Sequence, residues 1–267
     1  MDKATLGGLL LAIGGILTGL MLEGGTVAQI VQPTAAMIVF GGTIGAVMVQ
    51  FPLPVVVKSF RALAGVFLDS EGDLQLVIKE IVGYANKARK EGIVSLDNEL
   101  PKIQDPFLKR SLMLAIDGSE PQELRNMMEL ELVNQEAHEE RIPQVFESAG
   151  GFSPTIGIIG AVLGLIQVMQ HLDNITEVGR GIAVAFVATI YGVGAANILF
   201  LPWAGKLKIR MQAAQLKRAM MLEGVISILE GLNPRMVNTK LQGFLAEAEG
   251  TSATQKEPLA ALKEQVS

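Results

Sequence analysis

The fold is decided by the stretch SPTIGIIGAVLGLIQVMQ at residues 153–170, which contains no aspartate, glutamate, lysine or arginine. It lies inside a run of 25 uncharged residues between Glu147 and Asp173. A helix needs about 20 mostly apolar residues to cross a bilayer, because the hydrocarbon core is about 30 Å thick and each residue rises about 1.5 Å. We therefore expect a membrane-spanning helix near residues 154–171.

Three further charge-free runs are long enough for the same purpose. They hold 19, 34 and 25 residues and lie between Lys3 and Glu23, between Glu23 and Lys58, and between Arg180 and Lys206. Buried core helices of a soluble protein are the alternative, but four such runs seldom coexist in a soluble chain of 267 residues. The first run lacks the basic start and small-residue cleavage site of a signal peptide, so we interpret it as a retained span. The sequence thus predicts four spans, near residues 4–22, 34–51, 154–171 and 181–202.

Composition excludes several classes of protein. Apolar residues make up 49% of the chain and charged residues 18%, against roughly 25% charged in a typical soluble domain. Together with a net charge of −5, this excludes intrinsic disorder and nucleic-acid binding driven by overall basicity. There is no cysteine, and the only histidines are His138 and His171. We therefore expect no disulfide, no thiol catalyst and no histidine-based metal site. We also predict no cofactor and no enzyme activity.

The distribution of lysine and arginine predicts the orientation of the spans. Residues 52–147 hold 11 of these side chains and residues 206–267 hold 9, whereas loop 23–33 holds none and loop 172–180 holds only Arg180. Both large segments and both termini are therefore expected in the cytoplasm. The predicted domains are two spans, a helical cytoplasmic domain, two more spans, and cytoplasmic helices with a tail, at residues 1–54, 55–147, 148–205 and 206–267.

The segment before the third span has the pattern of amphipathic helices. Apolar residues recur at helical spacing at Leu74, Val77, Ile78, Ile81 and Val82. Pro121, preceded by Ser119 and Glu120, is typical of a helix start. No run alternates with a period of two, so we predict an all-α, polytopic membrane protein with no sheet.

Small residues recur at helical spacing inside the spans. Close backbone approach through such residues supplies packing in lipid, where little hydrophobic drive exists between helices. The faces formed in this way can pack within the chain or against other subunits, and the sequence leaves both possibilities open. They comprise Gly8, Ala12, Gly15 and Gly19; Gly41 and Gly45; Gly157, Gly160, Ala161 and Gly164; and Ala185, Ala188, Gly192 and Ala195.

The spans contain no aspartate, glutamate, lysine or arginine, although a proton pathway ordinarily uses a protonatable group in the membrane. His171 stands at the outer end of the third span, where an interfacial histidine is favoured over a proton relay. If ions cross here, the titrating carboxylate is expected to come from a partner helix. Thr189 would then face it with a hydroxyl, although an intrahelical bond to a carbonyl one turn back is an equal alternative. Pro154 is expected where the third helix starts, and Pro202 is expected to bend or end the fourth.

Five runs of the sequence resemble the A subunits of the bacterial flagellar stator, the MotA and PomA family. The order of four spans also matches, whereas the broader relatives ExbB and TolQ have three. The runs are SPTIGIIGAVLGLI at 153–166, AFVATIYG at 185–192, LPWAGKLK at 201–208, KARKEGIVSLD at 87–97 and MLEGVISILEGLNPR at 221–235.

The resemblance implies partners and site residues. It implies a ring of five A subunits around two copies of a MotB-like single-span B subunit, which brings a membrane aspartate and a peptidoglycan-binding domain. Ion flow past that aspartate is expected to turn the ring, so that cytoplasmic charges push the rotor protein FliG. By position, Pro154, Pro202 and Thr189 match the ion pathway of the family. Arg89 matches its rotor-facing arginine, and Asp97 stands where many members have glutamate.

The resemblance also suggests which ion is carried. Sodium-driven members have threonines at the positions of Ala161 and Ala188. A dehydrated sodium ion needs several oxygen ligands, whereas a proton needs only an acceptor. We therefore predict a proton-driven stator subunit in the bacterial inner membrane. The alternatives are an ExbB- or TolQ-like energiser of envelope transport and a non-conducting membrane scaffold.

Overall fold

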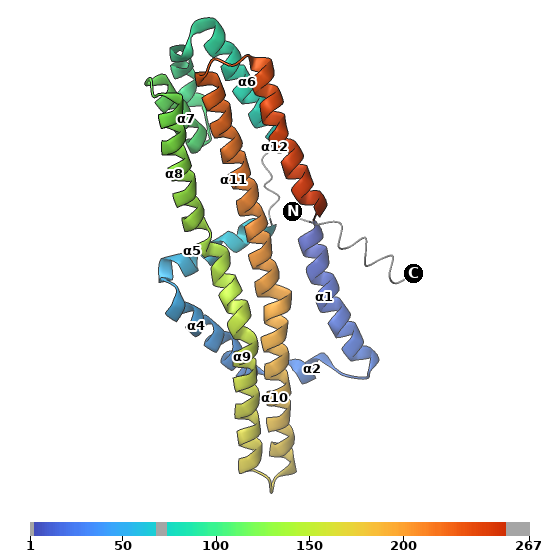
Figure 1. The fold of residues 1–267 in the computed structure, drawn as a ribbon. Coiled ribbons are helices and arrows are strands. Elements are labelled where there is room, and N and C mark those ends of the chain that lie inside the picture. Colours follow the sequence, from blue (N-terminus) through green and yellow to red (C-terminus); the bar gives the residue numbers. More distant parts are fainter. Residues whose placement is uncertain (1–2, 68–73, 255–267) are drawn as a thin grey trace. The chain divides into compact units, whose positions relative to one another are not determined.

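The computed structural model describes residues 3–67 and 74–254. These residues form helices and no strand (Figure 1), which confirms the predicted all-α class. They fall into two compact units. The first unit comprises residues 3–67 and 139–209, and the second unit comprises residues 74–138 and 210–254.

Four helical stretches of the described chain are long and apolar enough to cross a membrane, as the charge-free runs predict. A short helix, α2 (Val27–Ile30), lies between the first two stretches. The four stretches are α1 (Lys3–Leu22), the continuous helix from α3 to α4 (Pro33–Gln50), α9 (Arg141–Gln170), and the continuous helix from α10 to α11 (Ile175–Leu229).

Two of these stretches contain a wider π turn. The first is η1 (Met37–Gly41), which joins α3 (Pro33–Ala36) to α4 (Gly42–Gln50). The second is η3 (Ala195–Phe200), which joins α10 (Ile175–Gly194) to α11 (Leu201–Leu229). π turns are rare inside α-helices and often mark functional positions.

Of the two expectations for Pro202, that it bends or that it ends the fourth helix, the second is wrong, because α11 continues to Leu229. The proline follows directly after η3. Proline has no N–H to place in the hydrogen-bond ladder, so the turn before it can widen without leaving another donor unpaired.

The expected position of Pro154 also needs correction. Helix α9 begins at Arg141, so Pro154 lies inside the helix and not at its start. A proline there removes one helical hydrogen bond and crowds the carbonyl of Gly150, at a cost of about 3 kcal/mol. Packing outweighs this cost, because α9 is buried on both sides of the proline, at Phe146 and at Gly157.

Helices α9 and α10 form an antiparallel pair whose backbones approach closely at glycines (Figure 1). A Cβ atom added to Gly192 would lie 2.6 Å from the backbone oxygen of Ser153, and one added to Gly160 would lie 2.8 Å from Cβ of Ala188. The small-residue faces of the third and fourth spans therefore pack against each other within the chain. In contrast, a Cβ atom added to Gly8 or Gly15 of α1 would meet no atom within 4 Å.

Helix α5 (Leu53–Phe67) follows the second span and packs in the first unit. Its buried residues Val56 and Ser59 lie on the side that faces the core formed with α9. Phe146 of α9 contacts Phe60 of α5 edge to face, with ring centroids 5.8 Å apart. The same phenylalanine contacts Trp203 of α11 at 6.2 Å.

The second unit is a helical bundle with its own apolar core. It contains α6 (Leu74–Glu91), the 3-10 segment η2 (Ile93–Lys102), α7 (Pro106–Ile116), α8 (Pro121–Glu139), part of α11 and α12 (Pro234–Thr254). Helix α8 begins at Pro121, as predicted. The largest fully buried side chains of this core are Ile81, Leu96, Leu108, Leu112, Leu124, Met128, Met220, Met221, Ile226 and Leu241.

Candidate functional site

Thr189 lies on α10 with its side chain half-buried. Its hydroxyl donates a hydrogen bond to the backbone oxygen of Ala185, one turn back, at 3.2 Å. This is the intrahelical bond that the sequence left as an alternative. A hydroxyl that donates within its helix can still accept, because its oxygen has two lone pairs. Thr189 therefore offers an acceptor to any group that approaches the exposed part of its side chain.

The two alanines of the predicted ion pathway occupy different environments. Ala188 is 0% exposed and lies between α9 and α10, where its Cβ faces Gly160. Ala161 is half-buried on α9. Neither methyl side chain brings an oxygen ligand, and the buried position of Ala188 also leaves no space there for a larger side chain.

The two prolines also differ in exposure, since Pro154 is half-buried and Pro202 is exposed. Next to Pro154, the fully buried hydroxyl of Ser153 donates to the backbone oxygen of Gly192 at 2.8 Å, which joins α9 to α10. Hydrogen bonds of this kind between helices stabilise packing in membranes. The sequence reasoning missed Ser153. The available signal was a hydroxyl in a charge-free run at the start of a glycine-lined face.

Tyr191 of α10 binds the backbone of the non-helical connection between α2 and α3. Its hydroxyl donates to the carbonyl oxygen of Ile30 at 2.6 Å and accepts from the N–H of Gln32 at 3.2 Å. Its ring lies 6.2 Å from the ring of Phe40. The sequence does not predict this contact, because nothing local indicates a partner 161 residues away.

An ion pair joins the helices that carry the two prolines. Lys208 of α11 and Glu147 of α9 approach to 2.5 Å, with both side chains partly exposed. Glu147 is the last acid before the third charge-free run, and Lys208 follows the fourth run closely.

Arg89 and Asp97, the predicted rotor-facing residues, are both exposed in the second unit. Arg89 lies in the last turn of α6, and Asp97 lies in η2. Within the described part of the chain, neither side chain makes an ion pair or a hydrogen bond. Their charges are therefore available to a partner.

Glu99 lies close by in sequence and is bound by two lysines. Its Oε1 atom lies 2.6 Å from Nζ of Lys87, and its Oε2 atom lies 2.9 Å from Nζ of Lys102. Hydrogen bonds from Lys87 and then Lys102 stabilise the carboxylate and lower the pKa of Glu99 from 4.5 to about 2. Glu99 is thus fully ionised at neutral pH, and both of its oxygens are occupied.

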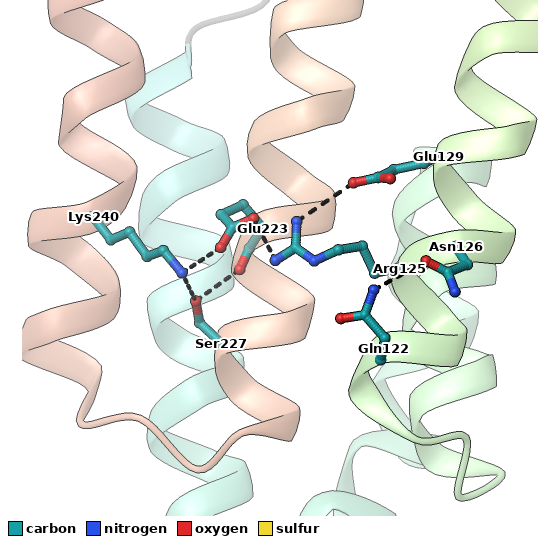
Figure 2. A network of polar contacts seen from close by, with 7 residues as sticks. All are labelled: Gln122, Arg125, Asn126, Glu129, Glu223, Ser227 and Lys240. Atoms are coloured by element: carbon teal, nitrogen blue, oxygen red, sulfur yellow. Dashed lines mark hydrogen bonds and ion pairs between the residues drawn. The ribbon is translucent and has the colours of Figure 1, made fainter.

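A second ionic network links three helices of the second unit, as Figure 2 shows. Glu223 of α11 binds Arg125 of α8 at 2.9 Å and also pairs with Lys240 of α12. Lys240 reaches the hydroxyl of Ser227 at 3.5 Å, and Arg125 extends to Glu129 at 3.6 Å. The side chain of Glu223 is 16% exposed, while those of Arg125 and Lys240 are 30% and 43% exposed, so this carboxylate is the most shielded charged group of the network.

Metal binding has no support in the described residues, which contain no group of three histidine, aspartate or glutamate side chains able to hold an ion.

Comparison with known families gives the class of the protein. Residues 99–220 match the MotA/TolQ/ExbB proton channel family, and residues 6–92 match the family described as motility protein A N-terminal. Together with the four apolar helices, these matches define a polytopic helical membrane protein of the proton channel family.

Individual relatives narrow the class. Motility protein A of Bacillus subtilis is 35% identical over 249 residues, which cover 92% of this chain and 91% of the relative. The solved structure of C. jejuni MotAB matches with a TM-score of 0.86 at 32% identity, covering 91% of this chain and 96% of that chain. The flagellar MotAB stator complex from Bacillus subtilis matches with a TM-score of 0.85 at 33% identity, covering 94% and 100%. The chain belongs to the motility protein A family and is a stator A subunit of the flagellar motor.

Proposed function

We propose that this A subunit forms an ion channel with a single-span, MotB-like B subunit, and that the channel converts ion-motive force into torque on the rotor. One observation carries the proposal: the predicted spans contain no aspartate, glutamate, lysine or arginine, and their one histidine, His171, stands at the outer end of the third span. Because proton pathways ordinarily need a protonatable group in the membrane, the A subunit requires a partner that brings one. The solved structures that this chain resembles are described as MotAB complexes, which supports such a partner.

The proposed assembly is a ring of five A subunits around two B subunits. The exposed apolar surface of the first unit supports an oligomer, because α9 and α10 leave large side chains uncovered on their outer faces. These side chains include Ile158, Ile159, Val162, Phe186 and Ile190. In the ring, some of them face neighbouring subunits and others face lipid.

The carried ion is proposed to be a proton. Ala161 and Ala188 supply no hydroxyl for a sodium ion, and Thr189 offers an acceptor at a half-buried position. Dependence of swimming speed on sodium at fixed pH tests this choice, and a strict sodium requirement contradicts it.

The subunit is proposed to lie in the bacterial inner membrane with both termini in the cytoplasm, because lysine and arginine concentrate in the two large segments. The second unit would then present Arg89 and Asp97 to the rotor protein FliG. Both residues are exposed and without a partner among the described residues, which leaves their charges free to act on a rotor.

Reconstitution into liposomes tests the proposed function. We expect proton flux when the A subunit is reconstituted with its B subunit, and no specific flux from the A subunit alone. Thr189→Leu should block flux while the complex still co-purifies, and Arg89→Glu should leave flux intact while weakening torque in cells. Full specific flux from the A subunit alone would contradict the proposal that the B subunit supplies the titrating carboxylate.

An energiser of the ExbB or TolQ type is disfavoured, because the match to the motility protein A N-terminal family covers the first two spans. Loss of motility with an intact envelope, on deletion of the gene, separates the two functions.

A further inference from the structure

The two segments that carry the exposed charges are tied together by one carboxylate. Glu99 of η2 binds Lys87 of α6 at 2.6 Å through one oxygen and Lys102 at 2.9 Å through the other. The side chains of Glu99 and Lys87 are 21% and 28% exposed, whereas Lys102 is 71% exposed. The contact with Lys87 is therefore the more sheltered of the two, and it joins different elements.

The position of this contact along the chain is informative. Lys87 stands two residues before Arg89, and Glu99 stands two residues after Asp97. Between them the chain reverses at Gly92, whose φ of 85° is a left-handed conformation that glycine adopts without strain. The ion pair thus closes the loop whose two arms carry Arg89 and Asp97.

The η2 segment depends on contacts such as this ion pair to hold its conformation. It is built from 3-10 turns, whose hydrogen bonds have poorer geometry than those of an α-helix, and it contains Pro101. Leu96 anchors it in the apolar core at 0% exposure, but Asp97 and Asn98, which follow, are exposed. Ile93 and Leu100 of the same segment also pack against this core, so apolar contacts fix the depth of η2 and the ion pair of Glu99 adds a polar contact with α6.

We propose that Glu99 is a positioning residue of the rotor-facing surface: by binding Lys87 and Lys102 it holds η2 against the end of α6 and so sets the placement of Asp97 relative to Arg89. This inference rests on the proposed function, because it concerns the surface that the proposed function assigns to the rotor. The proposal assigns Glu99 no rotor contact, because each of its carboxylate oxygens already accepts a hydrogen bond from a lysine of the same chain.

The main experiment compares charge variants in cells that lack their own A subunit. Glu99→Gln and Lys87→Gln should each lower torque at high load about twofold, because a partly exposed ion pair biases the segment without locking it. Proton flux with the B subunit and the amount of complex in the membrane should stay unchanged. Lys79→Gln is the matched control, because Lys79 is an exposed lysine of the same helix, without a partner among the described residues.

A charge swap separates positioning from direct rotor contact. Lys87→Glu combined with Glu99→Lys should restore torque, because the pair is re-formed with its signs exchanged. The swap is made in a Lys102→Gln background, so that the new lysine meets no like charge. A rotor contact by Glu99 would fail under this reversal of sign, and a swap that stays as defective as Glu99→Gln overturns the proposal.

Hydrogen exchange gives a readout that does not depend on the rotor. Amides of residues 94–98 should exchange faster in Glu99→Gln than in the parent complex or in Lys79→Gln, and unchanged exchange overturns the proposal. Normal torque in Glu99→Gln together with weak torque in Arg89→Glu would overturn the positioning role alone. Normal torque in Arg89→Glu would overturn the rotor surface itself.

Discussion

Single polar side chains hold together backbone that apolar packing alone would leave unsatisfied. Tyr191 is the clearest case, because one hydroxyl serves a carbonyl and an N–H of the connection between α2 and α3. Non-helical backbone beside a membrane span requires such partners, since lipid offers none. Ser153 does similar work between α9 and α10 by donating to Gly192.

Removal of the Tyr191 hydroxyl should therefore lower the free energy of unfolding. Tyr191→Phe leaves the carbonyl of Ile30 and the N–H of Gln32 unpaired, which is worth about 1–3 kcal/mol for a buried group. We expect a lower melting temperature of the purified protein in detergent. The control is Thr155→Val, which removes an exposed hydroxyl whose bond to Phe152 stays within its own helix. Equal melting temperatures of the two variants would contradict the role of Tyr191.

The Glu99 carboxylate makes a prediction about pH. Its pKa is lowered from 4.5 to about 2 by hydrogen bonds from Lys87 and Lys102. A group whose pKa is lower in the folded state stabilises that state above its unfolded pKa, so this contribution is complete above about pH 4.5 and is lost as the pH falls towards about 2.

Carboxyl titration by NMR of isotope-labelled glutamate in the detergent-solubilised protein measures this shift. Lys87→Gln should move the Glu99 pKa upward, because it removes the strongest of the bonds to the carboxylate. Lys79→Gln should leave the pKa of Glu99 unchanged. An unchanged Glu99 pKa in Lys87→Gln would show that the pair does not form in solution.

At the scale of elements, the membrane helices α9 and α10 pack closely where glycines stand in place of larger side chains. Gly157, Gly164 and Gly192 allow α9 and α10 to approach until the backbone of one helix lies against the backbone of the other, and at Gly160 the nearest atom is Cβ of Ala188. No large apolar side chain separates the helices at these positions, in keeping with the use of small residues where lipid supplies little hydrophobic drive.

A single added methyl group tests this packing. Gly192→Ala places a Cβ atom 2.6 Å from the backbone oxygen of Ser153, so the helices must move apart. Overpacking of this kind typically costs about 1–3 kcal/mol. Gly194→Ala is the control, because a Cβ atom there meets nothing within 4 Å. Thermal unfolding in detergent should rank Gly192→Ala well below Gly194→Ala, and equal stability would contradict the close approach.

The sequence predicted the existence of these elements better than their ends. Charge-free runs located the four spans, because the cost of burying a charge in lipid is large enough to override local preferences. Pro154 misled the placement of the third helix, since the buried contacts on both sides of it come from distant segments. The partners of Ser153, Tyr191 and Glu99 escaped prediction for the same reason, as they depend on which helices meet.

At the scale of the whole molecule, the chain divides its stabilising forces between two units. The first unit combines small residues, aromatic contacts, a few hydrogen bonds and the ion pair of Glu147 with Lys208, whereas the second unit adds ionic networks to an apolar core. Glu223 binds partners on two other helices, so it connects α8, α11 and α12 (Figure 2).

Glu223→Gln should weaken the second unit. It leaves Lys240 without its charged acceptor and Arg125 with Glu129 alone, and the loss of a shielded hydrogen-bonded group costs about 1–3 kcal/mol. Hydrogen exchange in α12 should accelerate, while the amides of α9 and α10 keep their rates. Glu230→Gln, an exposed change near the end of the same helix, should do neither. If both variants exchange alike, the network does not secure α12.

The π turn at Ala195–Phe200 affects how well the chain tolerates deletion of a residue. Such a turn accommodates one residue more than the α-turn that would replace it. Loss of a single codon there would restore a regular helix and still leave the flanking faces, including the one that carries Lys208, pointing in nearly their present directions. Removal of one residue at this turn is therefore expected to disturb the fourth span less than removal of one residue from its regular α-helical part.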